Sequence, residues 1–127
     1  MTDSLDHFAL AVADLDERIA FFTSHMGMAL RRMGKENSTG NRIAMLADPN
    51  SGFKLELIES PDRSGLQHIA RRVEDVQASY DRMVAAGLKP LREPHRIGAA
   101  KAESALVEDP SGLKVQIIRY DPDSPDL

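Results

Sequence analysis

Residues 5–12 read Leu5-Asp6-His7-Phe8-Ala9-Leu10-Ala11-Val12, and the pattern returns from residue 66, a shift of 61 positions, as Leu66-Gln67-His68-Ile69-Ala70-Arg71-Arg72-Val73. A second stretch also occurs twice. It first reads Asp48-Pro49-Asn50-Ser51-Gly52-Phe53-Lys54-Leu55-Glu56 and then, one residue shorter, Asp109-Pro110-Ser111-Gly112-Leu113-Lys114-Val115-Gln116. The chain is therefore an internal duplication with a period of about 60 residues, which is the size of one supersecondary unit.

Each repeat predicts a strand, a helix and three further strands. Alternating apolar residues in 5–12 indicate a strand, and Asp14 with Glu17 three positions later is typical of a helix N-terminus. Asp75 takes the place of Asp14 in the second repeat, and Gly27 and Gly87 supply helix stops. The remaining strands are expected at 28–36, 42–47, 53–59, 66–73, 88–93, 102–108 and 113–120.

These elements predict an α+β fold of two βαβββ repeats, 5–59 and 66–120. Their strands are expected to form a curled mixed-sheet cup with the helices on the outside. Repeats of this size would be marginally stable alone, so we expect one domain over residues 1–127. A polar linker at 60–65 joins the repeats, and the tail at 121–127 is expected to be frayed.

Composition limits the classes of function. The 127 residues carry a formal net charge of −4, which argues against nucleic acid as a partner. The chain shows no apolar run long enough to cross a bilayer, and its polar start, Met1-Thr2-Asp3-Ser4, has no signal-peptide core, so the cytoplasm is the expected location. Because the chain has no cysteine, any metal must be bound by nitrogen and oxygen atoms.

Side-chain alternation places four polar residues on the sheet face that the helices leave open. His7 points away from Phe8 and Leu10, and Glu56 points away from its apolar neighbours. His68 and Gln116 occupy the same places in the second repeat. Buried polar groups need partners, and one divalent metal ion would satisfy all four side chains. A hydrogen-bonded core histidine, a surface Glu56 on an edge strand and a structural hydrogen bond from Gln116 are the alternatives.

These motifs resemble the vicinal oxygen chelate superfamily, which includes glyoxalase I, methylmalonyl-CoA epimerase, bleomycin resistance proteins and extradiol dioxygenases. The resemblance extends from Leu5 to about Tyr120, and among these members the sequence motifs are most similar to those of bacterial glyoxalase I. It is carried by Asp6-His7-Phe8, by Met26-Gly27-Met28-Ala29-Leu30-Arg31, and by Val107-Glu108-Asp109-Pro110-Ser111-Gly112-Leu113-Lys114.

The resemblance implies a metal held by His7, Glu56, His68 and Gln116. Similar glyoxalases carry a carboxylate where this chain has Gln116, and a carboxamide cannot accept a proton near neutral pH. Methylmalonyl-CoA epimerase is similar in combining two histidines, one glutamine and one glutamate. Glu56 is then the expected catalytic base, and the metal is nickel, zinc, manganese, cobalt or iron.

The leading hypothesis is a metal-dependent lyase or isomerase of the glyoxalase I or acyl-CoA epimerase type, which stabilises an enediolate or enolate. Two alternatives stay open. His7, Glu56 and His68 also match the two-histidine, one-carboxylate set of non-haem iron dioxygenases. A noncatalytic small-molecule binding protein, similar to bleomycin resistance proteins, would use the same cup without metal chemistry.

Two further residues are candidates for binding a small-molecule substrate. Arg72 follows His68 by two alternations of the strand, so it could bind an anionic group of the substrate. The alternative is that it is an exposed arginine at the end of a strand. His95 lies in a segment at 93–101 that is expected to be a loop able to close over substrate, although a plain mobile loop fits equally well. Family members commonly form dimers, so a homodimer is expected.

Overall fold

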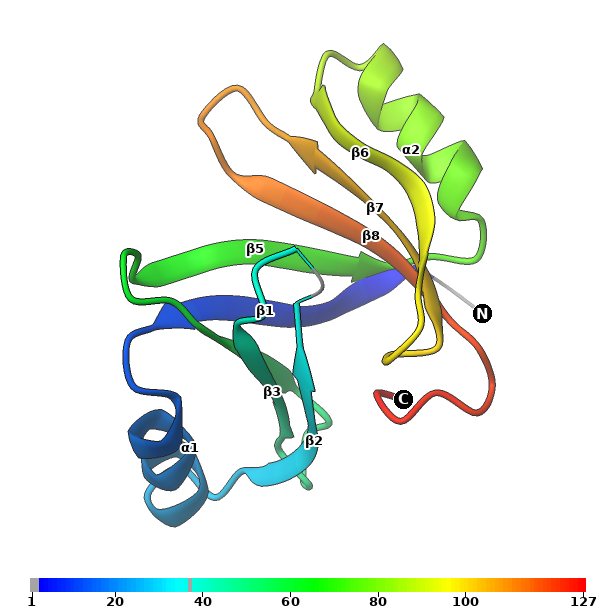
Figure 1. The fold of residues 1–127 in the computed structure, drawn as a ribbon. Coiled ribbons are helices and arrows are strands. Elements are labelled where there is room, and N and C mark those ends of the chain that lie inside the picture. Colours follow the sequence, from blue (N-terminus) through cyan, green and yellow to red (C-terminus); the bar gives the residue numbers. More distant parts are fainter. Residues whose placement is uncertain (1–2, 37) are drawn as a thin grey trace. The chain divides into compact units, whose positions relative to one another are not determined.

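A computed structural model describes residues 3–36 and 38–127 (Figure 1). Met1 and Thr2 of the expected polar start, and Asn37 of an expected turn, lie outside the described residues. The elements follow the order predicted for a duplicated chain: β1 (Ser4–Val12), α1 (Leu15–Ser24), β2 (Ala29–Lys35), β3 (Arg42–Ala47), β4 (Lys54–Glu59), β5 (Gly65–Arg72), α2 (Val76–Ala85), β6 (Lys89–Ile97), β7 (Ala102–Glu108) and β8 (Lys114–Tyr120).

The chain divides into two compact units that correspond to the two repeats. The first unit comprises residues 7–67, and the second comprises residues 3–6 and 68–127. The α+β class and the two βαβββ repeats are confirmed. Neither helix of the described chain has the length and apolar composition that a membrane span requires.

In the first unit the strands lie in the order β2-β3-β4-β1. β1 and β4 are parallel, with Ala9 opposite Glu56, whereas β3 is antiparallel to both β2 and β4. The second unit repeats this arrangement as β6-β7-β8-β5, and its parallel pair β5 and β8 places Ala70 opposite Gln116. The register of the parallel pair is therefore the same in both repeats.

Each helix begins at the predicted aspartate. The Asp14 carboxylate accepts a hydrogen bond of 3.1 Å from the backbone N–H of Glu17, and Asp75 accepts one of 3.0 Å from Ala78. An N-cap of this kind satisfies one of the backbone donors that a helix start leaves unpaired. Gly27 follows the first helix at φ 69° and Gly87 the second at φ 102°, a region that favours glycine.

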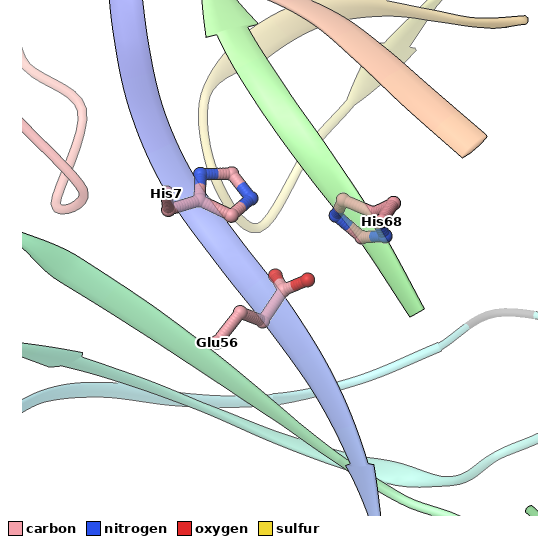
Figure 2. Close-up of side chains that lie close together, drawn as sticks. All are labelled: His7, Glu56 and His68. Carbon is pink, nitrogen blue, oxygen red and sulfur yellow. The ribbon is translucent and has the colours of Figure 1, made fainter. Parts of the chain in front are cut away.

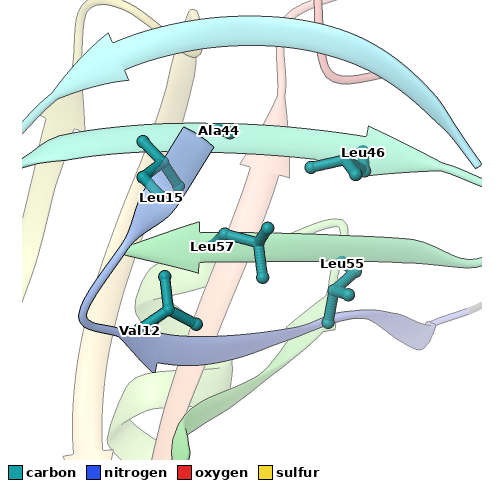
Figure 3. Close-up of a cluster of buried hydrophobic side chains, with 6 residues drawn as sticks. All are labelled: Val12, Leu15, Ala44, Leu46, Leu55 and Leu57. Carbon is teal, nitrogen blue, oxygen red and sulfur yellow. The ribbon is translucent and has the colours of Figure 1, made fainter. Parts of the chain in front are cut away.

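A leucine-rich core fills the space between α1 and one face of the strands of the first unit (Figure 3). Val12 and Leu57 come from the two parallel strands and contact Leu15 at the start of the helix. An equivalent core in the second unit includes Val76, Tyr80 and Ile117. In the described residues, each helix thus covers one sheet face, as predicted.

The methionines differ in burial, and two of them lie on the surface. Met26 is 59% exposed because α1 ends at Ser24, which takes Met26 out of the buried helix stripe. Met33 on β2 is 44% exposed, whereas Met45 is fully buried.

The segment expected to be a loop at 93–101 is mostly strand, so that expectation was wrong. β6 runs to Ile97 and pairs with β7, with His95 opposite Ser104. The connection between the two strands is therefore confined to a short turn, in which Lys101 adopts φ 48°.

The C-terminal residues make contacts that no sequence pattern predicted. The Ser124 hydroxyl donates to the backbone carbonyl of Ala100, and both Ser124 and Asp126 are buried. Asp121 and Asp123 pair with Arg96 and Lys101 of the β6–β7 hairpin. These contacts connect the tail to the turn of that hairpin.

Candidate metal centre

The first unit places His7 and Glu56 close together (Figure 2). They lie on the sheet face opposite α1, because Phe8 and Leu10, which alternate with His7, pack against the core beside α1. Glu56 lies opposite Ala9 across the parallel pair, so it is a diagonal neighbour of His7, two residues along the same face. The ligand atoms of the two side chains lie within 4.8 Å of each other. His7 is 2% exposed and Glu56 is half-buried. A small residue, Ala9, leaves room for this approach.

The second unit builds the same pair from His68 and Gln116. Gln116 lies opposite Ala70, which follows His68 by two residues on the same strand face. His68 is 9% exposed, and Ala70 is fully buried. Each repeat therefore presents one histidine and one side chain that carries an oxygen donor, in matching positions on the sheet face away from its helix.

The carboxamide of Gln116 has a defined orientation. Its Nε2 donates a hydrogen bond of 3.0 Å to the hydroxyl of Ser104 on β7, whereas its Oε1 is buried and has no hydrogen-bond partner among the described residues. A buried acceptor left without a donor costs roughly 1–3 kcal/mol. An oxygen of this kind is suited to a cation.

Ser104 was not identified from the sequence. It is 2% exposed and lies in β7, directly before the apolar residues Ala105, Leu106 and Val107. The sequence feature that could have identified it is a serine next to apolar strand residues, because a hydroxyl buried there needs a hydrogen-bond partner. The corresponding strand of the first repeat, β3, consists of apolar residues after Arg42 and carries no serine.

Matching Asp-Pro turns hold the strands that carry Glu56 and Gln116. The Asp109 carboxylate accepts hydrogen bonds of 2.7 Å from the Ser111 hydroxyl and 2.8 Å from the backbone N–H of Leu113. These bonds favour the ionised form and hold the pKa of Asp109 below its usual value. The backbone N–H of Asn50 and the Ser51 hydroxyl lower the pKa of Asp48 in the same way.

The two candidate substrate-binding residues share a face with Gln116. Arg72 lies opposite Ile118 on β8, Ile118 opposite Ser104 on β7, and Ser104 opposite His95 on β6. Residues opposite one another in neighbouring strands point to the same side of the sheet. Nδ1 of His95 lies 2.9 Å from the backbone oxygen of Glu93, which fixes the ring.

The donor set fits a divalent metal ion. Imidazole nitrogen, carboxylate oxygen and carboxamide oxygen are ligands for zinc, nickel, cobalt, manganese and iron, and the sequence offers no thiolate that would select a softer ion. The buried Oε1 of Gln116, which no donor of the described chain reaches, points to the same conclusion.

Comparison with known proteins agrees with this fold. Residues 4–117 match the model of the Glyoxalase/Bleomycin resistance protein/Dioxygenase superfamily. A probable lactoylglutathione lyase of Vibrio cholerae is 32% identical over 89% of this chain and 88% of its own length. The lactoylglutathione lyase of Haemophilus influenzae is 30% identical over 88% and 89%. The structure of methylmalonyl-CoA epimerase from Mycobacterium tuberculosis superimposes with a TM-score of 0.81 at 28% identity, covering 93% of this chain and 88% of that one.

The chain belongs to the glyoxalase, bleomycin resistance protein and dioxygenase superfamily. Within it, the relatives named above are lyases and an epimerase, and the predicted class of a lyase or isomerase is confirmed. The protein is an enzyme of this class.

Proposed function

We propose that His7, Glu56, His68 and Gln116 together hold one divalent metal ion, and that the enzyme isomerises the hemithioacetal of a 2-oxoaldehyde to a thioester. The observation that carries this proposal is the equal register of the two repeats. Each repeat places an oxygen donor one diagonal step from a histidine, with an alanine between them. Two half-sites of this kind provide the four ligands of one centre.

A metal bound by these residues would stabilise negative charge on two adjacent substrate oxygens. Glu56 is the single carboxylate in the proposed set, and it takes the proton from the carbon that carries sulfur and hydroxyl. The same carboxyl group returns that proton to the neighbouring carbonyl carbon, and the proton of the hydroxyl on the first carbon moves to the oxygen on the second. A hydroxyl thus forms at the second carbon, and a thioester carbonyl forms at the first. Gln116 cannot share this role because a carboxamide does not accept a proton near neutral pH.

A single base, Glu56, is better suited to isomerising a hemithioacetal than to epimerisation. A proton moved between adjacent carbons can leave and return on the same side of the substrate, whereas inversion at one carbon needs proton transfer on both sides. The lyases related at 30–32% identity support the same choice.

Acyl-CoA epimerisation is the second candidate. It is favoured by the donor set of two histidines, one glutamate and one glutamine, which resembles that of methylmalonyl-CoA epimerase. The structural similarity to such an epimerase at 28% identity supports it as well. A second base outside the four ligands would then be required.

Metal content and turnover test the proposal together. Elemental mass spectrometry should find about one divalent ion per chain in protein purified without chelator, and the ion should be lost in His7→Ala and in His68→Ala. His25→Ala, which changes an exposed histidine after α1, is the matched control.

Turnover of the methylglyoxal–glutathione hemithioacetal, and not of methylmalonyl-CoA, would support the lyase. The opposite preference would support the epimerase, and iron with oxygen consumption would support a dioxygenase. A metal-free wild type that stays empty after incubation with nickel, zinc, manganese and iron(II) would overturn the metal proposal and favour a binding protein.

We also expect a cytoplasmic homodimer. Sedimentation would establish the assembly, and mixing His7→Ala with His68→Ala copies would show how its sites are built. If two chains contribute to one site, each mixed dimer contains one complete ligand set out of two. Because random mixing makes about half of the dimers mixed, about a quarter of all sites are restored. If one chain supplies all ligands, mixing restores none.

A further inference from the structure

Arg72 presents a positive charge on the sheet face that carries His68 and Gln116. It follows His68 by four residues on β5, so the two side chains point the same way, with Ala70 between them. Four residues of strand correspond to about 13 Å between the two Cα atoms. Gln116 is closer to Arg72, because it lies opposite Ala70 on the neighbouring strand.

The guanidinium of Arg72 is incompletely satisfied. Its Nε is buried and has no hydrogen-bond partner among the described residues. Within the residues that the structure describes, no carboxylate forms an ion pair with Arg72. Arg72 as a whole is half-buried, but a buried donor such as its Nε normally has a hydrogen-bond partner, since leaving it unpaired costs free energy.

Packing on an aromatic ring accounts for only part of this arrangement. The guanidinium carbon lies 5.8 Å from the centre of the Tyr120 ring, at the outer limit of a cation–π contact. The Tyr120 hydroxyl donates to Asp6 and thereby fixes the ring. Tyr120 therefore positions Arg72 but does not satisfy Nε, which is a hydrogen-bond donor.

We propose that Arg72 is a specificity-determining residue that binds a carboxylate of the substrate, several atoms away from the two oxygens that approach the metal. This inference rests on the proposed function, because it uses the metal to define one end of the substrate. A guanidinium offers two parallel donors to a carboxylate, which adds both affinity and orientation. Substrates without this carboxylate are expected to bind more weakly.

Hydroxamates test the assignment, because their two adjacent oxygens can chelate a metal. Calorimetric titration of the zinc- or nickel-loaded protein would compare acetohydroxamate with the monohydroxamates of succinic and glutaric acids, which add a carboxylate at two distances. In the wild type, whichever of these two monohydroxamates binds better should bind roughly 10- to 100-fold more tightly than acetohydroxamate. Arg72→Met should remove this gain, and Arg72→Lys should keep part of it.

Arg71 provides the matched control, since it is the adjacent arginine on the same strand and points to the opposite face. Arg71→Met should keep the gain, and all variants should bind acetohydroxamate as the wild type does. A gain that survives in Arg72→Met, or equal binding of all three probes by the wild type, would overturn the role of Arg72. Loss of acetohydroxamate binding in Arg72→Met would also overturn it, by showing a general effect on the site. If no hydroxamate binds the metal-loaded wild type, the proposed function itself fails and the assignment of Arg72 falls with it.

Discussion

Gln116 and Ser104 are joined by a hydrogen bond that turns the Gln116 carboxamide oxygen away from the serine. Nε2 donates to the Ser104 hydroxyl at 3.0 Å, and Oε1 remains buried without a hydrogen-bond partner among the described residues. Groups that orient a metal ligand typically contribute 10- to 100-fold to metal affinity. The hydroxyl of Ser104 is therefore expected to matter although it need not touch the metal.

Replacing Ser104 should weaken metal binding. Ser104→Ala removes the acceptor for Nε2, so that the carboxamide loses its fixed orientation, and we expect affinity for zinc to fall roughly tenfold. Competition with a chromophoric chelator would measure the change. Ser104→Thr keeps the hydroxyl and should retain most of the affinity. Equal affinities for the wild type and Ser104→Ala would show that Gln116 is not a ligand.

Changing Gln116 to glutamate should strengthen metal binding. Gln116→Glu adds a second carboxylate to the proposed ligand set, and an anionic oxygen attracts a divalent cation more strongly than a neutral one. We expect at least a tenfold gain, by the same competition assay. Gln77→Glu, on the exposed side of α2, makes the same change of charge far from the sheet face and should leave the affinity unchanged. A gain in both variants would indicate a general charge effect.

The Asp109 turn predicts a stability difference that depends on pH. Hydrogen bonds from the Ser111 hydroxyl and the backbone of Leu113 lower the pKa of Asp109 in the folded protein. Because the folded pKa lies below the unfolded value of about 3.9, the stabilisation is complete above that pH and is lost as the pH falls through the folded value. Urea unfolding should therefore show wild type more stable than Asp109→Asn at pH ~7, with a smaller difference at pH ~3. Asp62→Asn, an exposed change in the linker, should show no difference at either pH.

The core of the first unit predicts a large effect for one leucine. Leu57 is fully buried between β4 and α1, and Leu57→Ala should lower the free energy of unfolding by about 2–5 kcal/mol. Leu66→Ala, at a side chain 53% exposed, should cost far less. Chemical denaturation would measure both. Similar values for the two variants would mean that the Leu57 site collapses around the shortened side chain.

Duplication made most of the fold predictable. Two copies of the same alternation indicate which face of each strand meets the helix, and they predict His7 and His68 on the opposite face, in agreement with the strand register. Asp14 and Asp75 were predictable as helix caps because an aspartate before an amphipathic stretch acts through local hydrogen bonds alone.

Features without a local signal were missed. The extension of β6 to Ile97 depends on pairing with β7. Pro94 lies within this strand and cannot donate a hydrogen bond to a neighbouring strand, so the local sequence does not indicate a strand here. The contact of Ser124 with Ala100 joins segments 24 residues apart, and the bond between Gln116 and Ser104 depends on strand register. Pairing between strands and long-range side-chain contacts are set by the folded structure, and residue spacing alone does not determine them.

Metal binding should stabilise the folded protein through the proposed ligands. An ion that binds the native state and not the unfolded chain adds about 2.7 kcal/mol at a free concentration 100 times its dissociation constant, which raises the midpoint of thermal unfolding by several degrees. Adding zinc to chelator-treated wild type should therefore raise the midpoint, and excess chelator should reverse the shift. His7→Ala and His68→Ala should each lose most of this response even if their metal-free midpoints resemble that of the wild type. His25→Ala should respond fully, since His25 is exposed after α1. A midpoint that rises equally in all four proteins would place the zinc elsewhere on the chain and would remove the basis for the proposed ligand set.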